Sequence, residues 1–354
     1  MGKIVNSSQG LSIRNVSKRF NSNDEAALTD VSLEVESGTT MAVLGESGSG
    51  KTTLLRLLAG FDQLDSGTIL MGEILVTDRR TAIPPEERRI GVVFQEIALF
   101  PHLNIYQNIT FGLRRFETEE REFHAERILK LVRVQDIRER YPHEVSGGQA
   151  QRAAIGRALA PGPELLLLDE PFNNLDPLLK GELLEELRNV LVKTKTTAVF
   201  VTHDRDEAFA VADNIAVLHQ GKIEQIGTAE SLYLSPVNDF IARYFGVTNL
   251  IPVTYTNGHW VSFLGIIKKS IEPFKYADGF AVSVRPSELE IAGLDSKNSD
   301  LVAATILSER FMGEFRELKV QVYNGLSEHQ LIVHAKVGLK LKLGQSINIG
   351  YRSV

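Results

Sequence analysis

Hydrophobic positions in the first two thirds of the chain form short continuous runs that alternate with helical patterns. Residues 41–45 (MAVLG), 165–168, 197–201 (TAVFV) and 215–219 are apolar runs of strand length. Runs of this kind are typical of strands that are buried on both faces of a parallel sheet. The pattern therefore predicts an α/β domain, in which a mainly parallel sheet is covered by helices.

One predicted helix begins after Asp176, because aspartate caps helices well and Pro177 is favoured in a first helical turn. Its apolar positions recur every three or four residues, so that the helix has one hydrophobic face. They are Leu178, Leu179, Leu183, Leu184, Leu187 and Leu191. This spacing predicts an amphipathic helix that packs on the sheet.

Beyond residue 240 the pattern changes to short alternating runs that are separated by Asn, Gly, Asp and Ser. The strand candidates are residues 280–284, 317–323, 330–337 and 346–351, with turn signals such as Asn324-Gly325 between them. We therefore expect two domains: an α/β domain over residues 1–240, with a helical subdomain at about 96–160, and a β-rich, barrel-like domain over 241–354.

Composition agrees with two folded domains, since 354 residues with 43% hydrophobic content are ample for two cores. No stretch approaches the roughly 18 apolar residues of a spanning helix, and residues 1–10 hold no apolar signal region. A membrane role would therefore depend on a partner. The chain has no cysteine, which excludes disulfides and thiolate metal sites and suits the cytoplasm.

The net charge of -6 is unevenly distributed. Residues 1–240 carry 26 basic and 35 acidic side chains, and residues 241–354 carry 13 and 10. Neither part has the concentrated basic surface that nucleic-acid binders usually show. We therefore expect no nucleic-acid partner.

The strongest chemical motif is a complete phosphate-binding loop between a predicted strand and a helical run at 53–59. It consists of Gly45, Glu46, Ser47, Gly48, Ser49, Gly50, Lys51 and Thr52. The glycines let backbone amides and the helix amino terminus point at the β- and γ-phosphates. Lys51 adds positive charge, Thr52 offers a hydroxyl to Mg²⁺, and Thr53 completes the predicted nucleotide contacts.

Two adjacent acids, Asp169 and Glu170, follow the apolar run at 165–168. Side chains alternate along an extended chain, so neighbouring acids at a strand end can serve different partners. Asp169 is the candidate ligand of Mg²⁺, and Glu170 is the candidate general base that polarises the attacking water. The alternative interpretation is an ordinary solvated strand end.

A second glycine-rich helix start decides between the families that share a phosphate loop. Val145 precedes Ser146, Gly147, Gly148 and Gln149, and a helical run to Ala160 follows. A hydroxyl and glycine amides at a helix amino terminus form an anion site. The segment resembles the signature motif of ABC ATPases. In that family two subunits pack head to tail and each signature closes on the partner's ATP, so the resemblance implies a homodimer.

The other motifs of the ABC family appear in order. Gln95 matches the Q-loop glutamine, which reaches the metal and water and links the site to the membrane partner; His203 matches the switch histidine at the γ-phosphate. Residues 173–176 match the D-loop, which places Asp176 at the dimer interface, and Phe20 lies where the family stacks an aromatic ring on adenine. A surface glutamine, a structural histidine and a core phenylalanine are the alternatives.

Some positions depart from the family pattern. Val145 stands where leucine is typical, Ala150 where glutamine is common, and Asn173-Asn174 where serine-alanine is frequent. None of these changes removes a group that contacts phosphate.

The resemblance extends to importers. Residues 91–113 resemble importer ATPases for sugars, polyamines and oxyanions. The last third resembles their oligonucleotide-binding-fold regulatory domain, with Ser287 inserted into an Arg-Pro-Glu turn, and its expected role is regulation or dimerisation. Gln95-Glu96 and residues 166–176 favour the iron(III) branch.

The resemblance thus implies the ATP-hydrolysing subunit of an iron(III) importer, with ATP and Mg²⁺ as cofactors. It would lie at the cytoplasmic face of the inner membrane, bound to permease subunits and indirectly served by a substrate-binding protein. Polyamine, sulfate, thiamine and sugar importers are alternative assignments. So are a non-transport ABC ATPase and a module that binds ATP without hydrolysing it.

Overall fold

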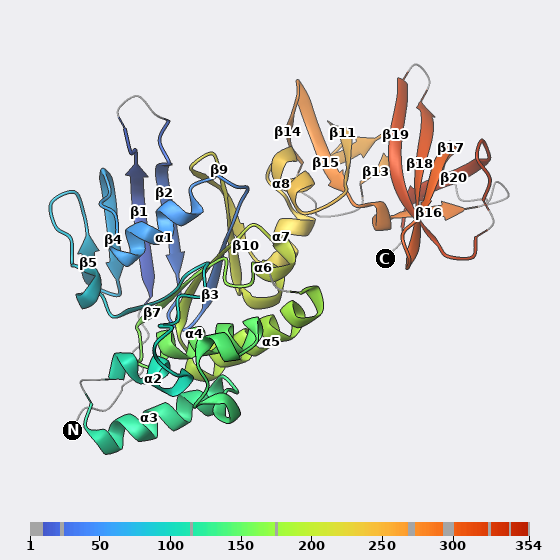
Figure 1. Cartoon of the computed structure of the whole chain (residues 1–354). Helices are drawn as coiled ribbons and strands as arrows, with labels where there is room; N and C mark the ends of the chain where they lie inside the picture. The colour runs from blue at the N-terminus through green and yellow to red at the C-terminus, as the bar shows by residue number, and fades with distance from the viewer. Residues whose placement is uncertain are drawn as a thin grey trace. The chain divides into compact units, whose positions relative to one another are not determined.

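A computed structural model describes residues 10–21, 25–113, 116–173, 176–267, 273–292, 301–324, 327–339 and 341–352 (Figure 1). Its internal contacts divide the chain into two compact units, Met1–Ala229 and Glu230–Val354. The division falls earlier than the boundary at 240 that the sequence suggested. Arg285 links residues 230–246 to the second unit, because its guanidinium donates hydrogen bonds to the carbonyls of Tyr233 and Ala242.

The first unit is built on a six-stranded sheet with the order β10-β9-β3-β8-β7-β6. Its strands are β3 (Thr40–Leu44), β6 (Ile90–Val93), β7 (Leu165–Asp169), β8 (Thr197–Thr202), β9 (Asn214–His219) and β10 (Lys222–Gly227). All neighbours pair in parallel except β9 and β10. This confirms the predicted α/β class.

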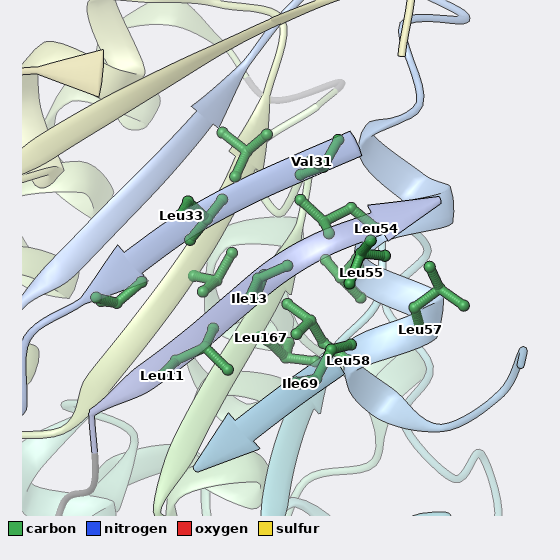
Figure 2. Close-up of a cluster of buried hydrophobic side chains, with 14 of the residues drawn as sticks. Leu11, Ile13, Val31, Leu33, Leu54, Leu55, Leu57, Leu58, Ile69 and Leu167 are labelled. Atoms are coloured by element: carbon green, nitrogen blue, oxygen red, sulfur yellow. The ribbon is translucent and has the colours of Figure 1, made fainter. Parts of the chain in front are cut away.

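A second, antiparallel sheet with the order β2-β1-β4-β5 covers one side of this unit. It comprises β1 (Leu11–Lys18), β2 (Leu28–Val35), β4 (Ser66–Met71) and β5 (Ile74–Thr77). Figure 2 shows its apolar face, with Leu11, Ile13 and Ile69, packed against the leucines of helix α1 (Lys51–Ala59). The shared core holds α1, and therefore the loop before it, in place.

The helices between β6 and β7 contact one another (Figure 1, blue-green to green). They are α2 (Ile105–Thr110), α3 (Thr118–Leu131) and α4 (Gly147–Leu159), with short 3₁₀ turns at Phe111–Leu113, Gln135–Ile137 and Pro142–Glu144. A Cβ on Gly156 of α4 would lie 3.1 Å from Val132 and 3.3 Å from Ile109. Glycine there lets α4 pack closely on its neighbours. Two further helices, α5 (Pro177–Thr194) and α6 (Arg205–Val211), flank β8 in sequence.

The second unit begins with α7 (Ala229–Leu234) and α8 (Asp239–Tyr244) and continues as two five-stranded sheets within its described residues. One sheet has β11 (Asn249–Thr256), β12 (His259–Ser262), β13 (Gly265–Ile266), β14 (Phe274–Tyr276) and β15 (Gly279–Val284). The other has β16 (Leu289–Ala292), β17 (Val302–Phe311), β18 (Phe315–Asn324), β19 (Ser327–Lys336) and β20 (Ser346–Tyr351). The prediction of a β-rich domain is confirmed. Gly325, part of a predicted turn, lies outside the described residues.

Among the helices in the described ranges, none is long and apolar enough to cross a membrane.

Candidate active site

Four neighbouring parallel strands end at the same edge of the central sheet. Leu44 of β3 pairs with Thr202 of β8, and Asp169 of β7 pairs with Val201 of β8. Val93 of β6 pairs with Leu168 of β7. The segments that follow these strands therefore meet at one edge, and they contain the phosphate loop, Glu170, His203 and Gln95. The sheet thus brings together residues that lie up to 158 positions apart in the sequence.

Backbone packing explains why the phosphate loop needs glycine at two positions. A Cβ on Gly45 would lie 2.3 Å from the carbonyl oxygen of Leu218, and one on Gly50 would lie 2.4 Å from that of Ala27. Gly50 also has a φ of 107°, in the left-handed region that disfavours side chains. Glu46 and Ser47 are exposed on the outer side of the loop. The loop is therefore a fixed turn with an accessible backbone.

The start of α1 is prepared for an anion. Gly50 caps the helix with no side-chain hydrogen bond, so the amides of the first turn remain available. The ammonium of Lys51 donates to the carbonyls of Gly45 and Glu46, both at 2.8 Å. Burial lowers the pKa of Lys51, while the charges of Glu170 and Asp169 act in the opposite direction. A bound phosphate would replace the two carbonyls with a stronger acceptor.

Asp169 lies at the end of β7, and its Oδ1 atom is buried without a hydrogen-bond partner in the described part of the chain. Burial raises the pKa of Asp169, the charge of Glu170 adds to the rise, and Lys51 opposes it. An unpaired buried carboxylate oxygen suits a hard cation such as Mg²⁺. The exposed Thr52 hydroxyl, on the first turn of α1, is the predicted second ligand. The residues present fit the predicted magnesium site.

Glu170 is held by side chains from two different segments. Asn173 donates from Nδ2 to Glu170 Oε2 at 2.8 Å, and His203 Nδ1 lies 3.3 Å from Glu170 Oε1. The backbone of Glu170 has a φ of 42°, and its N–H donates to Val201. The predicted base and the predicted switch histidine are thus in contact. The contact from Asn173 was not predicted, although its position three residues after Glu170 is a signal for it.

The predicted signature segment caps its own helix. The Ser146 hydroxyl accepts from the N–H of Gln149 at 3.3 Å, and the Gln149 side chain accepts from the N–H of Ser146 at 3.0 Å. Ser146 and Gly147 are exposed, and Gly148 is buried against Leu179 of α5. The start of α4 is therefore accessible at Ser146 and Gly147, and the anion site expected here stays a prediction.

The remaining candidates are at the periphery. Gln95 is exposed after β6, and Asp176 is exposed before α5; Asn174 and Leu175 of the predicted D-loop lie outside the described residues. Phe20 is 56% exposed, and the ammonium of Lys18 lies over its ring, 5.3 Å from the centroid. The core interpretation of Phe20 is therefore wrong, and its contact with adenine stays a prediction. Thr53 is half-buried in α1.

Comparison with known proteins identifies the family of the chain. Residues 28–173 match the family described as ABC transporter. The chain is 36% identical over 325 residues to a Haemophilus influenzae protein named Fe(3+) ions import ATP-binding protein FbpC 2. The alignment covers 91% of this chain and 90% of that protein. The chain belongs to the ATP-binding proteins of ABC transporters. ATP binding is the property that this family shares.

Other relatives are named for the import of different substrates. A spermidine/putrescine import ATP-binding protein of Trichormus variabilis is 37% identical over 89% of this chain and 84% of that protein. A sulfate/thiosulfate import ATP-binding protein of Xanthomonas campestris is 41% identical over 79% of this chain and 81% of that protein.

Two solved structures of ABC proteins resemble the chain. One is CbiO1 of Clostridium perfringens, part of an ABC transporter complex, which matches with a TM-score of 0.59 at 27% identity. The match covers 64% of this chain and 91% of the CbiO1 chain. A dimeric ATP-binding cassette bound to ADP and phosphate has a TM-score of 0.54 at 29% identity, with coverage of 62% and 98%. Both matches confirm the cassette fold of the first unit.

Proposed function

We propose that the chain is the ATP-hydrolysing subunit of an ABC importer and that it works as a homodimer bound to permease subunits at the cytoplasmic face of the inner membrane. The observation that carries the proposal is the contact between Glu170 and His203 at the sheet edge where the phosphate loop begins. A carboxylate held by two side chains has a defined direction, which a general base requires.

In the proposed reaction, the loop amides and Lys51 hold the β- and γ-phosphates, and Phe20 stacks on the adenine. Glu170 accepts a proton from the attacking water, and His203 donates a hydrogen bond to the γ-phosphate. Mg²⁺, when held by Asp169, Thr52 and Gln95, would supply charge neutralisation at the phosphates. The chain's own residues thus orient the water and the phosphate toward each other.

Substitution of the base tests hydrolysis. We expect Glu170→Gln to bind ATP as tightly as the parent and to hydrolyse it at least about a hundredfold more slowly, because the amide cannot accept the proton. The closed dimer should accumulate with ATP and be visible by size-exclusion chromatography with light scattering. Phosphate release at the parent rate would show that Glu170 is not the base.

The exposed signature segment, whose Ser146 caps its own helix, supports a site that is shared between two chains. The amino terminus of α4 can contact a bound phosphate only if another protein surface docks on it. In a head-to-tail dimer, each signature would close on the partner's phosphate loop. Two defective variants test this: Ser146→Arg blocks the signature, and Lys51→Ala disables the phosphate loop. A mixed dimer contains one intact composite site only when the two motifs come from different chains.

We expect each variant alone to be inactive and their mixture to recover at least about a tenth of the parent hydrolysis rate. Refolding the mixture at increasing ratios should give a maximum near equal amounts. If the mixture stays as inactive as its components, each signature serves its own chain and the head-to-tail dimer is ruled out.

We propose Fe(3+) as the cargo. The Gln95-Glu96 pair and residues 166–176 support this assignment, and so do the two relatives from Haemophilus influenzae named for Fe(3+) import. The polyamine and sulfate relatives define the alternatives. Deletion of the gene should impair growth when Fe(3+) is the sole iron source. A defect confined to polyamine or sulfate limitation would reassign the cargo.

A further inference from the structure

Four linked side chains, of which Thr202 and Glu207 are buried and Lys180 and Asp204 are partly exposed, have no part in the reaction described above. Thr202 ends β8, Asp204 and Glu207 lie at the start of α6, and Lys180 comes from the first turn of α5. Lys180 Nζ lies 2.7 Å from Asp204 Oδ2 and 2.5 Å from Glu207 Oε1. The Thr202 hydroxyl donates to the other Glu207 oxygen at 2.5 Å. One ammonium therefore links the starts of two helices.

The Lys180 ammonium compensates the negative charges of the Asp204 and Glu207 carboxylates. The Glu207 side chain is only 4% exposed, and a buried carboxylate is strongly destabilising without a partner. Burial alone would lower the pKa of Lys180, but its bonds to Asp204 and Glu207 outweigh burial and raise it. Burial would also raise the pKa of Asp204, yet the bond from Lys180 and the backbone bonds lower it. Lys180 and Asp204 are therefore both charged at neutral pH.

Other hydrogen bonds of Asp204 and Thr202 fix the backbone on both sides of His203. Asp204 Oδ1 accepts from the N–H groups of Asp206 at 2.8 Å and Glu207 at 3.4 Å, which caps α6. The N–H of Asp204 donates to the Thr202 hydroxyl at 3.0 Å, so that a closed turn spans His203. This turn holds the backbone from which the imidazole of His203 reaches Glu170.

We propose that Lys180 is a positioning residue for ATP hydrolysis and that it acts through His203. The inference rests on the proposed function, in which His203 contacts the γ-phosphate. Without Lys180, the carboxylates of Asp204 and Glu207 repel each other, the first turn of α6 loosens, and the imidazole loses its place beside Glu170. Because α5 starts directly after Asp176, Lys180 also ties the histidine to the segment predicted at the dimer interface.

Three substitutions in one helix test the inference. Lys180→Met removes the charge and keeps the length, Lys180→Arg keeps the charge, and Lys193→Met is the matched control at an exposed lysine of the same helix. We expect Lys180→Met to lower kcat about ten- to hundredfold while KM and ATP affinity stay within about twofold. Lys180→Arg should retain about a third or more of the parent kcat, and Lys193→Met should match the parent.

A double-variant comparison separates positioning from general stability. In a His203→Ala background, Lys180→Met should lower kcat by less than about twofold, because the residue through which it acts is already absent. The same fold loss in both backgrounds, or a loss that follows the fraction of protein unfolded, would overturn the inference.

A second readout does not need hydrolysis. The imidazole NMR signals of His203, assigned by their absence in His203→Ala, should shift in Lys180→Met and stay unchanged in Lys193→Met. Unshifted signals would overturn the role of Lys180. A parent protein that hydrolyses no ATP would overturn the proposed function instead, while the imidazole signals would still decide the inference.

Discussion

Asp169 shows how one residue can favour function over the stability of the nucleotide-free chain. Its Oδ1 atom has no hydrogen-bond partner in the described structure, and burial together with the charge of Glu170 raises its pKa above the usual 3.8. A raised pKa means that the folded protein disfavours the ionised form. The ionised carboxylate of Asp169 therefore destabilises the nucleotide-free protein, and a bound cation would stabilise it.

We expect Asp169→Asn to raise the melting temperature of the nucleotide-free protein at pH 7 to 8. The ionised carboxylate destabilises the fold fully above its raised folded pKa, and this penalty fades as the pH falls toward the unfolded value. The gain should therefore disappear near pH ~4. Differential scanning fluorimetry across pH measures it.

The same variant should lose the effect of the metal. In the parent, Mg²⁺ added with ATP should raise the melting temperature more than ATP alone, since ligands stabilise the state that binds them. Asp169→Asn should show no such increment. Glu185→Gln, at an exposed acid of α5, is the control and should behave as the parent. A lower melting temperature for nucleotide-free Asp169→Asn would contradict the argument.

At the scale of elements, two helices of the group between β6 and β7 start with the same chemistry. Asn104 and Gln107 form a reciprocal capping box at α2, and Ser146 and Gln149 form one at α4. Their shared geometry makes each a control for the other, because only the α4 cap belongs to the predicted signature.

We expect Asn104→Ala and Ser146→Ala each to lower the free energy of unfolding by about 1 kcal/mol, the usual contribution of a helix cap. Only Ser146→Ala should also lower ATP hydrolysis, by about tenfold or more, since its hydroxyl is predicted to contact phosphate. Urea unfolding and phosphate release measure the two effects. Equal losses of hydrolysis in both variants would mean that helix stability alone controls the rate.

The central strands could be predicted from the sequence because they are buried on both faces. The predicted strands at 41–45, 165–168, 197–201 and 215–219 agree with β3, β7, β8 and β9 to within one residue at each end. The antiparallel sheet was not predicted. The register of β1 against β2 shifts between Ile13 and Val16, with Asn15 at a φ of 50°, so that its alternation of polar and apolar residues is broken.

The site was predictable where its residues adjoin in the sequence. The phosphate loop and the Asp169-Glu170 pair are continuous motifs, and each carries its own chemistry. The link between Lys180 and Asp204 could not be predicted, because 24 residues separate them and only the packing of α5 against α6 brings them together. Contacts of this kind depend on tertiary structure, which local patterns do not encode.

At the scale of the whole molecule, one buried cation joins the first two helices of the second unit to the strands that follow them. Arg285 is 1% exposed, and its guanidinium donates to the carbonyls of Tyr233, Ala242 and Gly246 at 2.8 to 3.2 Å. It also stacks 4.1 Å from the centroid of the Tyr233 ring. These bonds join α7 and α8 to the loop after β15.

We expect Arg285→Met to destabilise the second unit by about 3 kcal/mol, because it leaves several buried carbonyls without donors. The first unit has its own core and should hydrolyse ATP at the parent rate at 25 °C, a temperature ~20 °C below typical unfolding. Trp260 is the chain's one tryptophan and lies in the second unit, where its ring is 5.4 Å from that of Phe280, so its fluorescence reports unfolding there.

The Trp260 transition should therefore move to lower temperature while phosphate release stays unchanged. Arg310→Met, at a guanidinium with a 67% exposed side chain that pairs with Glu317, is the control and should shift the transition little. A fall in hydrolysis in step with the Trp260 signal would instead mean that the two units unfold as one cooperative body. In that case the buried guanidinium would support the active site as well as the β-rich unit.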